Sequence, residues 1–343
     1  MKKYMLMLVM LASTLAAMAQ EKKDTVIITL RNGTEVRYTS DEFDRVQIIY
    51  NLKYGVKVYL KDGKSKDYLA EKVVVAEYHS GDSVVADLNT NRNLYRAKLL
   101  EYPHLAADST MNQLIIKSTE EFGITFSLEW SYADKANRWT CYQMHAGNTV
   151  KNVTRKDAFR EDPEIPPQYR SKLSDYSNSG FSRGHLCPSA DRLCSQEQNS
   201  QTFFLSNMQP QHQNHNNGLW ARLEDMIRVW ADNCDTLYVV KAATIRSDQL
   251  LDEKCNNSLI VPKYFYMAVL AYNKSFNTYE AMGLWTEHSS KTDSNKNLGD
   301  YAITIDALEE RTGIDFFCNL PDAIEDDKER KINLNYWGIT KTN

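Results

Sequence analysis

Three short polar motifs between residues 182 and 228 constrain the fold of this 343-residue chain most. The first is Ser182-Arg183-Gly184-His185, the second runs from Asn207 to Gln211, and the third begins at Asn216. The third motif leads into Leu219–Trp230, whose apolar pattern predicts an amphipathic helix. Strands are predicted at Trp139–Met144, Thr236–Ala243 and Tyr264–Tyr272. The larger part of the chain is therefore predicted to be α+β, with its functional residues in the middle.

The first motif carries the residue types that hydrolysis of a phosphodiester needs. Such a cut requires a base that deprotonates water and a cation that steadies the phosphate and the leaving oxygen. Histidine has an unperturbed pKa near neutral pH, which makes His185 the candidate general base. Arg183 offers a planar fork of donors that matches phosphate oxygens. Gly184 has no Cβ, so the backbone beside His185 can pass close to a neighbour.

The third motif places Asn216, Glu224 and Arg228 at spacings that keep them on one helix face, with a drift of about 40° per four residues. Asn216 stands near the N-terminal end, where its amide oxygen can bind a hard cation. Mg²⁺ usually takes only one or two protein oxygens and keeps several waters, so a single ligand is chemically reasonable. Two structural alternatives stay open: Asn216 as a helix N-cap, and Glu224 with Arg228 as a surface ion pair.

In this order the motifs resemble those of the DNA/RNA non-specific endonucleases, which are ββα-metal (His-Me finger) nucleases. That family combines Asp-Arg-Gly-His, an Asn-x-x-Pro-Gln segment, and an Asn followed by Glu at +8 and Arg at +12, as found here from Asn216. The resemblance covers roughly residues 115–340 and includes Thr312–Phe317. It implies hydrolysis of DNA and RNA without sequence specificity, with 5′-phosphate and 3′-hydroxyl products.

The resemblance also implies roles for the site residues. Mg²⁺, or Mn²⁺ as a substitute, would bind Asn216, while Arg183, Glu224 and Arg228 would stabilise the phosphate and the water shell of the metal. Two further residues, Asn207 and Gln211, are expected to hold the active-site loop through bonds from their side chains to the backbone.

One position departs from the family pattern, and one expected residue is ambiguous. Ser182 stands where the family has Asp, and a hydroxyl keeps only a neutral hydrogen bond, so the role of this position is open. The family also has an upstream arginine that contacts phosphate. Arg155 and Arg160 are the two candidates here, and neither falls cleanly into register.

The N-terminus predicts export. Two lysines precede the apolar run Tyr4–Ala19, which ends in a small-x-small sequence typical of a signal-peptidase site, so residues 1–19 are predicted to be a signal peptide. The run is short for a membrane helix, although an uncleaved anchor is the alternative. We expect a periplasmic or extracellular protein without a stable membrane anchor.

Export bears on the six cysteines, all of which lie beyond residue 140. An even number in an oxidising compartment suggests disulfides, although their pairing is not readable from sequence. No C-x-x-C sequence occurs, so a zinc ribbon is not expected. His212 and His215 have the spacing of a zinc pair, but no third ligand accompanies them, and we expect no zinc site there.

Residues 20–80 are predicted to form a small β-rich module of two similar units. In each unit a strand, Val26–Leu30 or Val56–Leu60, runs into a turn with Asn-Gly or Asp-Gly and then into a second strand. A third apolar strand closes each unit, at Val46–Tyr50 and Val73–Tyr78. Residues 81–112 are interpreted as a linker and 113–343 as the endonuclease domain.

The charge balance limits how nucleic acid can bind. A net charge of −4 excludes binding through bulk positive charge, so contacts must come from local basic side chains. Two other functions stay open from sequence. One is a catalytically weak protein that binds nucleic acid or a surface on the same scaffold, which Ser182 favours. The other is a phosphodiesterase for small nucleotides.

Overall fold

The computed structural model describes residues 25–30, 34–51, 54–69, 73–79, 91, 97–295 and 297–342. The chain divides into two compact units, Met1–Ala86 and Asp87–Asn343. The predicted signal peptide, and residues 81–90 and 92–96 of the predicted linker, lie outside the described residues. None of the helices in the described part of the chain is long and apolar enough to cross a membrane.

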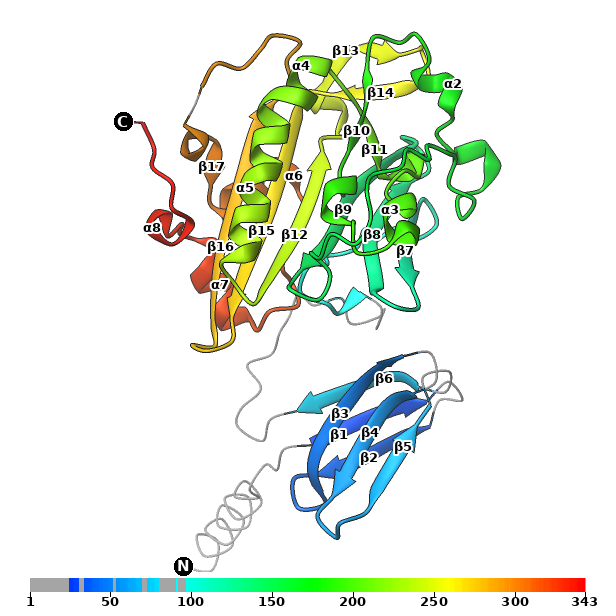
Figure 1. Ribbon diagram of the computed structural model, residues 1–343, viewed down its shortest axis with the longest axis vertical. Coiled ribbons are helices and arrows are strands. Elements are labelled where there is room, and N and C mark those ends of the chain that lie inside the picture. The colour runs from blue at the N-terminus through cyan, green and yellow to red at the C-terminus, as the bar shows by residue number, and fades with distance from the viewer. Residues whose placement is uncertain are drawn as a thin grey trace, which may run out of the picture. The chain divides into compact units, whose positions relative to one another are not determined.

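The N-terminal unit contains six strands in two three-stranded antiparallel sheets, with the orders β2-β1-β6 and β3-β4-β5 (Figure 1). The strands are β1 (Thr25–Leu30), β2 (Glu35–Thr39), β3 (Phe43–Asn51), β4 (Tyr54–Leu60), β5 (Ser65–Tyr68) and β6 (Val73–His79). The two predicted repeats, β1–β3 and β4–β6, therefore exchange their third strands: β3 pairs with β4, and β6 pairs with β1. The alternating apolar side chains of β1 and β4 meet in a small core that includes Ile28 and Val58.

The C-terminal unit is built on a seven-stranded antiparallel sheet with the order β17-β16-β15-β12-β9-β8-β7. Its strands are β7 (Asn112–Thr119), β8 (Gly123–Ser131), β9 (Ala136–Met144), β12 (Thr236–Ala243), β15 (Tyr264–Asn273), β16 (Thr278–Glu287) and β17 (Ala302–Ile303). The predicted strands fall in β9, β12 and β15. These central strands are buried along most of their length because both faces of the sheet are covered.

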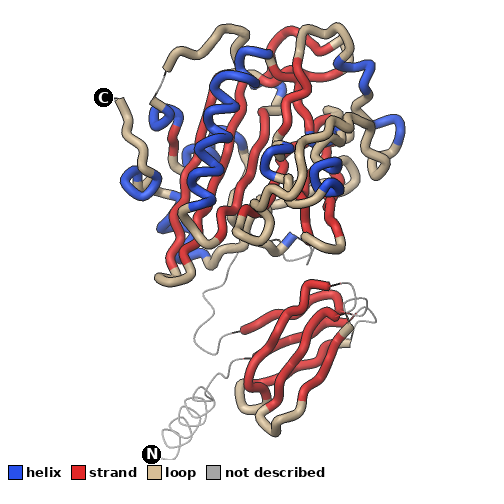
Figure 2. The backbone as a smooth tube through the Cα atoms, viewed as in Figure 1, coloured by secondary structure: helices blue, strands red, loops and turns tan. Residues whose placement is uncertain are grey.

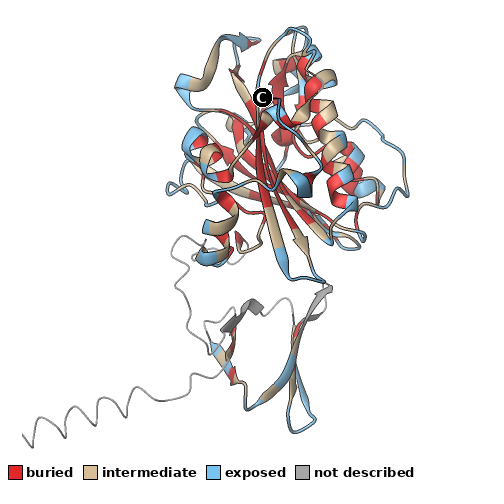
Figure 3. Cartoon of the chain, turned by 90° about the vertical axis from the view of Figure 1, so that its left-hand side faces the viewer, coloured by how far each residue is buried: buried red, intermediate tan, exposed pale blue. Residues whose placement is uncertain are grey.

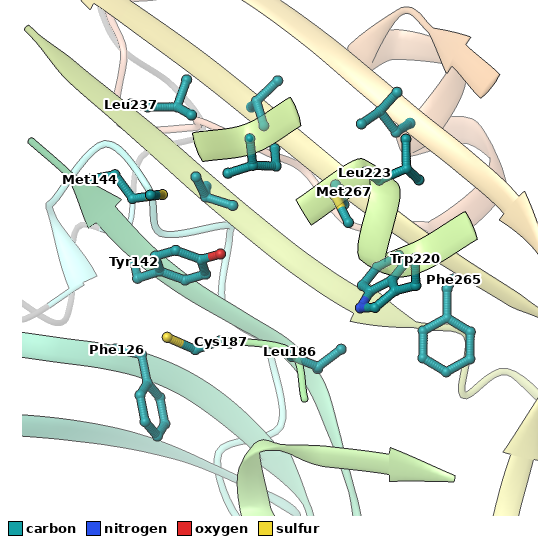
Figure 4. Packing of buried hydrophobic residues seen from close by; sticks show 14 of the residues in the cluster. Phe126, Tyr142, Met144, Leu186, Cys187, Trp220, Leu223, Leu237, Phe265 and Met267 are labelled. Carbon is teal, nitrogen blue, oxygen red and sulfur yellow. The ribbon is translucent and has the colours of Figure 1, made fainter. Parts of the chain in front are cut away.

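Helices cover both faces of this sheet (Figures 2 and 3). On one face α5 (Ala221–Asp232) buries Leu223 and Ile227 in a cluster with Met267 and Leu237, part of which Figure 4 shows. On the other face α6 (Ile305–Thr312) buries Ile305 and Leu308 in a second cluster, and α7 (Asp322–Glu329) also packs on β16. The remaining short helices are α2 (Leu173–Tyr176), α3 (Gln196–Gln201), α4 (Gln213–His215) and α8 (Leu334–Trp337). The fold class is α+β, as predicted.

The predicted disulfides are not present, because all six cysteines are free thiols. Cys141, Cys187 and Cys255 are buried in three different apolar clusters, where each thiol packs as a small apolar group. Burial raises the pKa of the Cys187 thiol to about 12, which keeps it protonated. The even count of cysteines carries no information about these separate locations, and this is why the expectation failed.

Candidate active site

The three sequence motifs fold into one ββα unit. The first motif forms β10 (Ser182–His185), and the second contributes β11 (Met208–Gln211). The two strands pair antiparallel, with Ser182 opposite Gln211 and His185 opposite Met208. The chain then enters α4, continues through a π-helical turn at Asn216–Trp220, and runs on as α5 (Figure 1). Each motif therefore supplies one element of the unit.

The π-helical turn changes the alignment of the third motif. In a regular α-helix at 100° per residue, a residue at +8 would lie about 80° away from Asn216 around the axis, and one at +12 about 120° away. A π-bulge inserts one residue into the α-helix. With about seven and eleven effective steps, Glu224 and Arg228 each lie only about 20° from Asn216. The three residues therefore share one face more closely than regular helical spacing predicts.

Arg155, Arg183 and Asn216 line one open cleft of about 670 Å³, together with Ser182, Asp157 and Phe159. The exposed Arg183 guanidinium stacks on the Phe159 ring, 3.8 Å from its centroid. Arg155 donates from Nε to Asp157 at 2.7 Å. The Ser182 hydroxyl hydrogen-bonds the Gln213 side chain, so it ties β10 to the start of α4.

The structure separates the two candidate upstream arginines. Arg155 lies in the cleft with Arg183, whereas Arg160 lines a different pocket. The Arg160 guanidinium stacks 3.8 Å from the centroid of Phe204 and donates to the carbonyls of Ala158 and Ser200 at 2.8 Å. Arg160 therefore ties its loop to α3 (Gln196–Gln201), and Arg155 is the arginine available to a ligand in this cleft.

His185 ends β10, whose Ser182 and Arg183 line this cleft, but does not line the cleft itself. Its ring lies 5.6 Å from the ring of Phe159 and 5.1 Å from that of Phe203, measured between centroids. Burial, with the positive charge of Arg155, lowers the pKa of His185 to about 3. Its Nε2 is buried and has no hydrogen-bond partner among the described residues. The imidazole is therefore neutral near pH 7, with a ring nitrogen that no protein group uses.

Close packing explains the glycine beside the histidine. A Cβ on Gly184 would lie 2.1 Å from Oε1 and 2.8 Å from Cβ of Gln211, on the paired strand. Asn207 fastens the adjacent loop, accepting from the Cys187 N–H at 2.9 Å and donating to the Cys187 carbonyl at 2.8 Å. Gln211 differs from the expectation of a bond to the backbone, because its Nε2 lies 2.6 Å from Nδ1 of His215.

His212 and His215, the two histidines with the spacing of a zinc pair, both contact other residues of the protein. The ring nitrogens of His215 lie beside Gln211 and the Thr286 hydroxyl, the latter at 3.2 Å. The backbone N–H of His212 donates to Nε2 of His288 at 2.7 Å, and His212 Nε2 lies 3.3 Å from a carboxylate oxygen of Glu253. These contacts tie the start of α4 to neighbouring strands.

Glu224 and Arg228 lie farther along α5 and do not line the cleft. They also do not pair with each other. Glu224 accepts from the fully buried Lys241 at 3.2 Å, while Arg228 contacts Asp191 at 2.8 Å. Burial raises the pKa of Glu224, and the charge of Lys241 opposes that effect. Lys241 and Asp191 are not among the residues predicted from sequence, although a lone lysine inside the predicted strand Thr236–Ala243 is a visible signal.

Asn216 suits a hard cation. Its Nδ2 donates weakly to the neighbouring Asn217 at 3.3 Å, and its Oδ1 accepts no hydrogen bond from the residues that the structure describes. The side chain is half-buried at the rim of the cleft. A single neutral oxygen in an open cleft matches Mg²⁺, which keeps most of its waters when it binds protein.

Comparison with known proteins identifies the family of this chain. The model for DNA/RNA non-specific endonucleases matches residues 108–323. The chain belongs to this family. It is therefore an enzyme, a nuclease, in a family that acts on nucleic acids and depends on a divalent metal.

Several nucleases are similar to this family member over its C-terminal unit. A nuclease of Nostoc sp. is 28% identical over 228 residues, which cover 65% of this chain and 79% of that protein. Nuclease C1 of Cunninghamella echinulata var. echinulata is 30% identical over 207 residues, covering 57% of this chain and 81% of that protein. The mitochondrial nuclease EXOG of Homo sapiens is 28% identical, and the match spans 57% of this chain and 55% of EXOG.

A solved structure supports the fold. EndoG in its crystallised complex with EndoGI superposes with a TM-score of 0.52 at 21% identity, over 61% of this chain and 88% of that one. The endonuclease fold of the C-terminal unit thus agrees with the prediction from the three motifs.

Proposed function

We propose that this family member is an exported, Mg²⁺-dependent endonuclease that hydrolyses DNA and RNA without sequence specificity. One observation carries the proposal. The ββα unit holds a neutral histidine with an unpartnered nitrogen next to a cleft that contains two arginines and a free amide oxygen. Export rests on the sequence of residues 1–19. The names of the similar nucleases agree with the activity.

Arg183 and Arg155 bind the scissile phosphate in this proposal. Stacking on Phe159 limits the motion of the Arg183 guanidinium and aims its donors at the cleft. Arg155 keeps donors free beyond the bond from its Nε to Asp157. Contacts to phosphate position a nucleic acid without reading its bases, which accounts for cleavage independent of sequence.

His185 accepts the proton of the attacking water, and we assign Nε2 as the acceptor. Without substrate its pKa is low because burial and the nearby arginines oppose a charged ring. A bound phosphate brings negative charge, which offsets Arg155 and Arg183 and raises the pKa toward the working pH. The base thus gains strength when substrate is present.

Asn216 Oδ1 would hold the Mg²⁺, with water completing the coordination. When bound, this ion would stabilise the charge that develops on the phosphate and on the leaving oxygen. Mn²⁺, which also prefers oxygen ligands, is a possible substitute. Ser182 acts indirectly, because its bond to Gln213 keeps β10 against the helix that bears Asn216.

Glu224 and Arg228 act as positioning residues. Lys241 lowers the pKa of His185 through its charge, and Glu224 neutralises Lys241 at 3.2 Å. Arg228 binds the buried Asp191, whose other oxygen accepts from the Tyr142 hydroxyl at 2.9 Å. Together these pairs set the electrostatic environment behind the base and fix α5 against the sheet.

A digest tests the function directly. Purified protein and the His185→Ala variant would be incubated with matched all-deoxy and all-ribo oligonucleotides, with Mg²⁺ or with EDTA, and the termini identified by mass. We expect the wild type with Mg²⁺ to cut both substrates and to leave 5′-phosphate and 3′-hydroxyl ends. Cleavage confined to RNA, 2′,3′-cyclic phosphate ends, or full activity in EDTA would refute the proposal.

A further inference from the structure

A second cleft, of about 580 Å³, lies between α6 and α7, away from the ββα unit. Among the described residues, nine line this cleft, and seven of these carry carboxylates. Both helices pack on β16 on the sheet face opposite α5 (Figures 1 and 3). The two clefts share no lining residue.

The helical periods of α6 and α7 produce this arrangement. Asp322, Glu325, Asp326 and Glu329 follow the spacing i, i+3, i+4, i+7, which aligns them along one face of α7. On α6, Asp306 and Glu309 are three residues apart and face the same cleft. Like charges at these spacings repel each other, so neither helix gains stability from the pattern itself.

Two lysines near the cleft, Lys328 and Lys331, bind carboxylates that do not line it. Lys328 contacts Asp327 at 3.3 Å and Glu280 at 3.8 Å, while Lys331 contacts Asp327 at 2.6 Å. Neither Asp327 nor Glu280 lines the cleft. In the described part of the chain, Asp306, Glu309 and Glu329 form no ion pair with a lysine or arginine.

Glu329 is the observation that points to a ligand. Its exposed fraction is only 7%, and its Oε1 is buried without a hydrogen-bond partner among the described residues. A buried carboxyl oxygen without a partner is costly in a folded protein, so it calls for a group that the cleft would receive.

The cluster has the dimensions of a cation site. One carboxylate oxygen from each of Asp306, Glu309 and Glu329 lies within 4.8 Å of the other two. Two oxygens on one Ca²⁺ are at most about 5 Å apart, because each lies 2.3–2.6 Å from the ion. Glu309 is already oriented, since its Oε1 accepts the Phe316 N–H at 2.7 Å and its other oxygen stays available.

We propose that this acidic cleft is a calcium site, distinct from the active site, with Asp306, Glu309 and Glu329 as its ligands. Ca²⁺ accepts six to eight oxygens in flexible geometry, and the open cleft leaves room for waters and for the other carboxylates. Mg²⁺ demands near-ideal octahedral geometry and usually binds one or two carboxylates, so it fits this cluster less well. Bound Ca²⁺ would join α6 to α7 and relieve the repulsion between them.

Thermal unfolding of the chelator-treated full chain tests the site, with calcium chloride as the probe. We expect millimolar Ca²⁺ to raise the Tm by about 3 °C or more, because an ion that binds only the folded state stabilises it. Glu329→Gln and Asp306→Asn should abolish this rise. Asp306 is exposed, so its variant will fold even if the Glu329 variant does not.

Two matched controls locate the effect. Glu310→Gln removes an exposed charge from α6 outside the cleft and should keep the full Ca²⁺-dependent rise. Asn216→Ala should keep it as well, because Asn216 lies in the other cleft. The proposal is overturned if wild type shows no rise, if Asp306→Asn keeps it, or if either control loses it.

Discussion

The two clefts of the C-terminal unit would bind a divalent cation through ligands of different charge. The cleft of the ββα unit offers the amide oxygen of Asn216 beside two arginines and a single carboxylate, Asp157, whereas seven carboxylates line the cleft between α6 and α7. A nucleic acid brings its own negative charge, so a protein that must bind both metal and phosphate needs few acidic ligands. A site without a substrate must supply all the negative charge itself. The comparison teaches that ligand charge distinguishes a metal shared with substrate from a metal held by protein alone.

Removing the base should produce the largest effect. His185→Ala should lower kcat by about 10²-fold or more, the range expected for loss of a positioned general base. The ring packs against Phe159 and Phe203, so the Tm must be measured alongside the rate. Wild-type rates in a folded His185→Ala variant would show that the ββα cleft is not the catalytic one.

Removing the metal ligand should separate the two clefts. Asn216→Ala should raise the Mg²⁺ concentration needed for half-maximal cleavage by about 10-fold or more, the size of change seen when metal sites lose supporting groups. Glu329→Gln should leave this Mg²⁺ requirement unchanged. Titration of cleavage rate against Mg²⁺ for both variants makes the comparison. A shift in the Glu329 variant rather than in the Asn216 variant would reverse the assignment of the two clefts.

The pair of upstream arginines allows a matched comparison within one loop. Arg155→Ala should raise KM for a DNA oligonucleotide by about 10-fold, the loss expected for a hydrogen bond to a charged group. It should also reduce the dependence of KM on salt. Arg160→Ala should leave both unchanged at a temperature where the protein is folded, because its guanidinium binds the carbonyls of Ala158 and Ser200 and does not line the cleft. Equal effects of the two substitutions would contradict the separation that the structure indicates.

Most residues of the candidate site could be predicted from local sequence patterns. The predicted strands and the predicted helix fall in β9, β12, β15 and α5, because strand and helix periods depend on neighbours along the chain. The choice between Arg155 and Arg160 needed tertiary packing, since both stand in similar sequence. The pairing of Glu224 with Lys241 joins a helix to a strand 17 residues away, which no local rule predicts. No local rule predicts that the two repeats of the N-terminal unit exchange their third strands. The burial of the cysteines in separate clusters is likewise a property of the assembled fold.

The smallest predicted effect is on the pH dependence of kcat/KM, which depends on the charges around His185. Because His185 must be unprotonated to act, kcat/KM should fall only as pH drops well below the usual histidine range, given its lowered pKa. Arg155 contributes to that lowering, so a charge-removing Arg155→Met variant should move the acid limb upward by about one pH unit or less. Glu224→Gln should move it downward, since Lys241 would then act without its counter-ion. Profiles of kcat/KM measured on one DNA oligonucleotide from pH 2.5 to 8 would compare the three proteins. Shifts in the same direction for both variants would show that these charges do not act through His185.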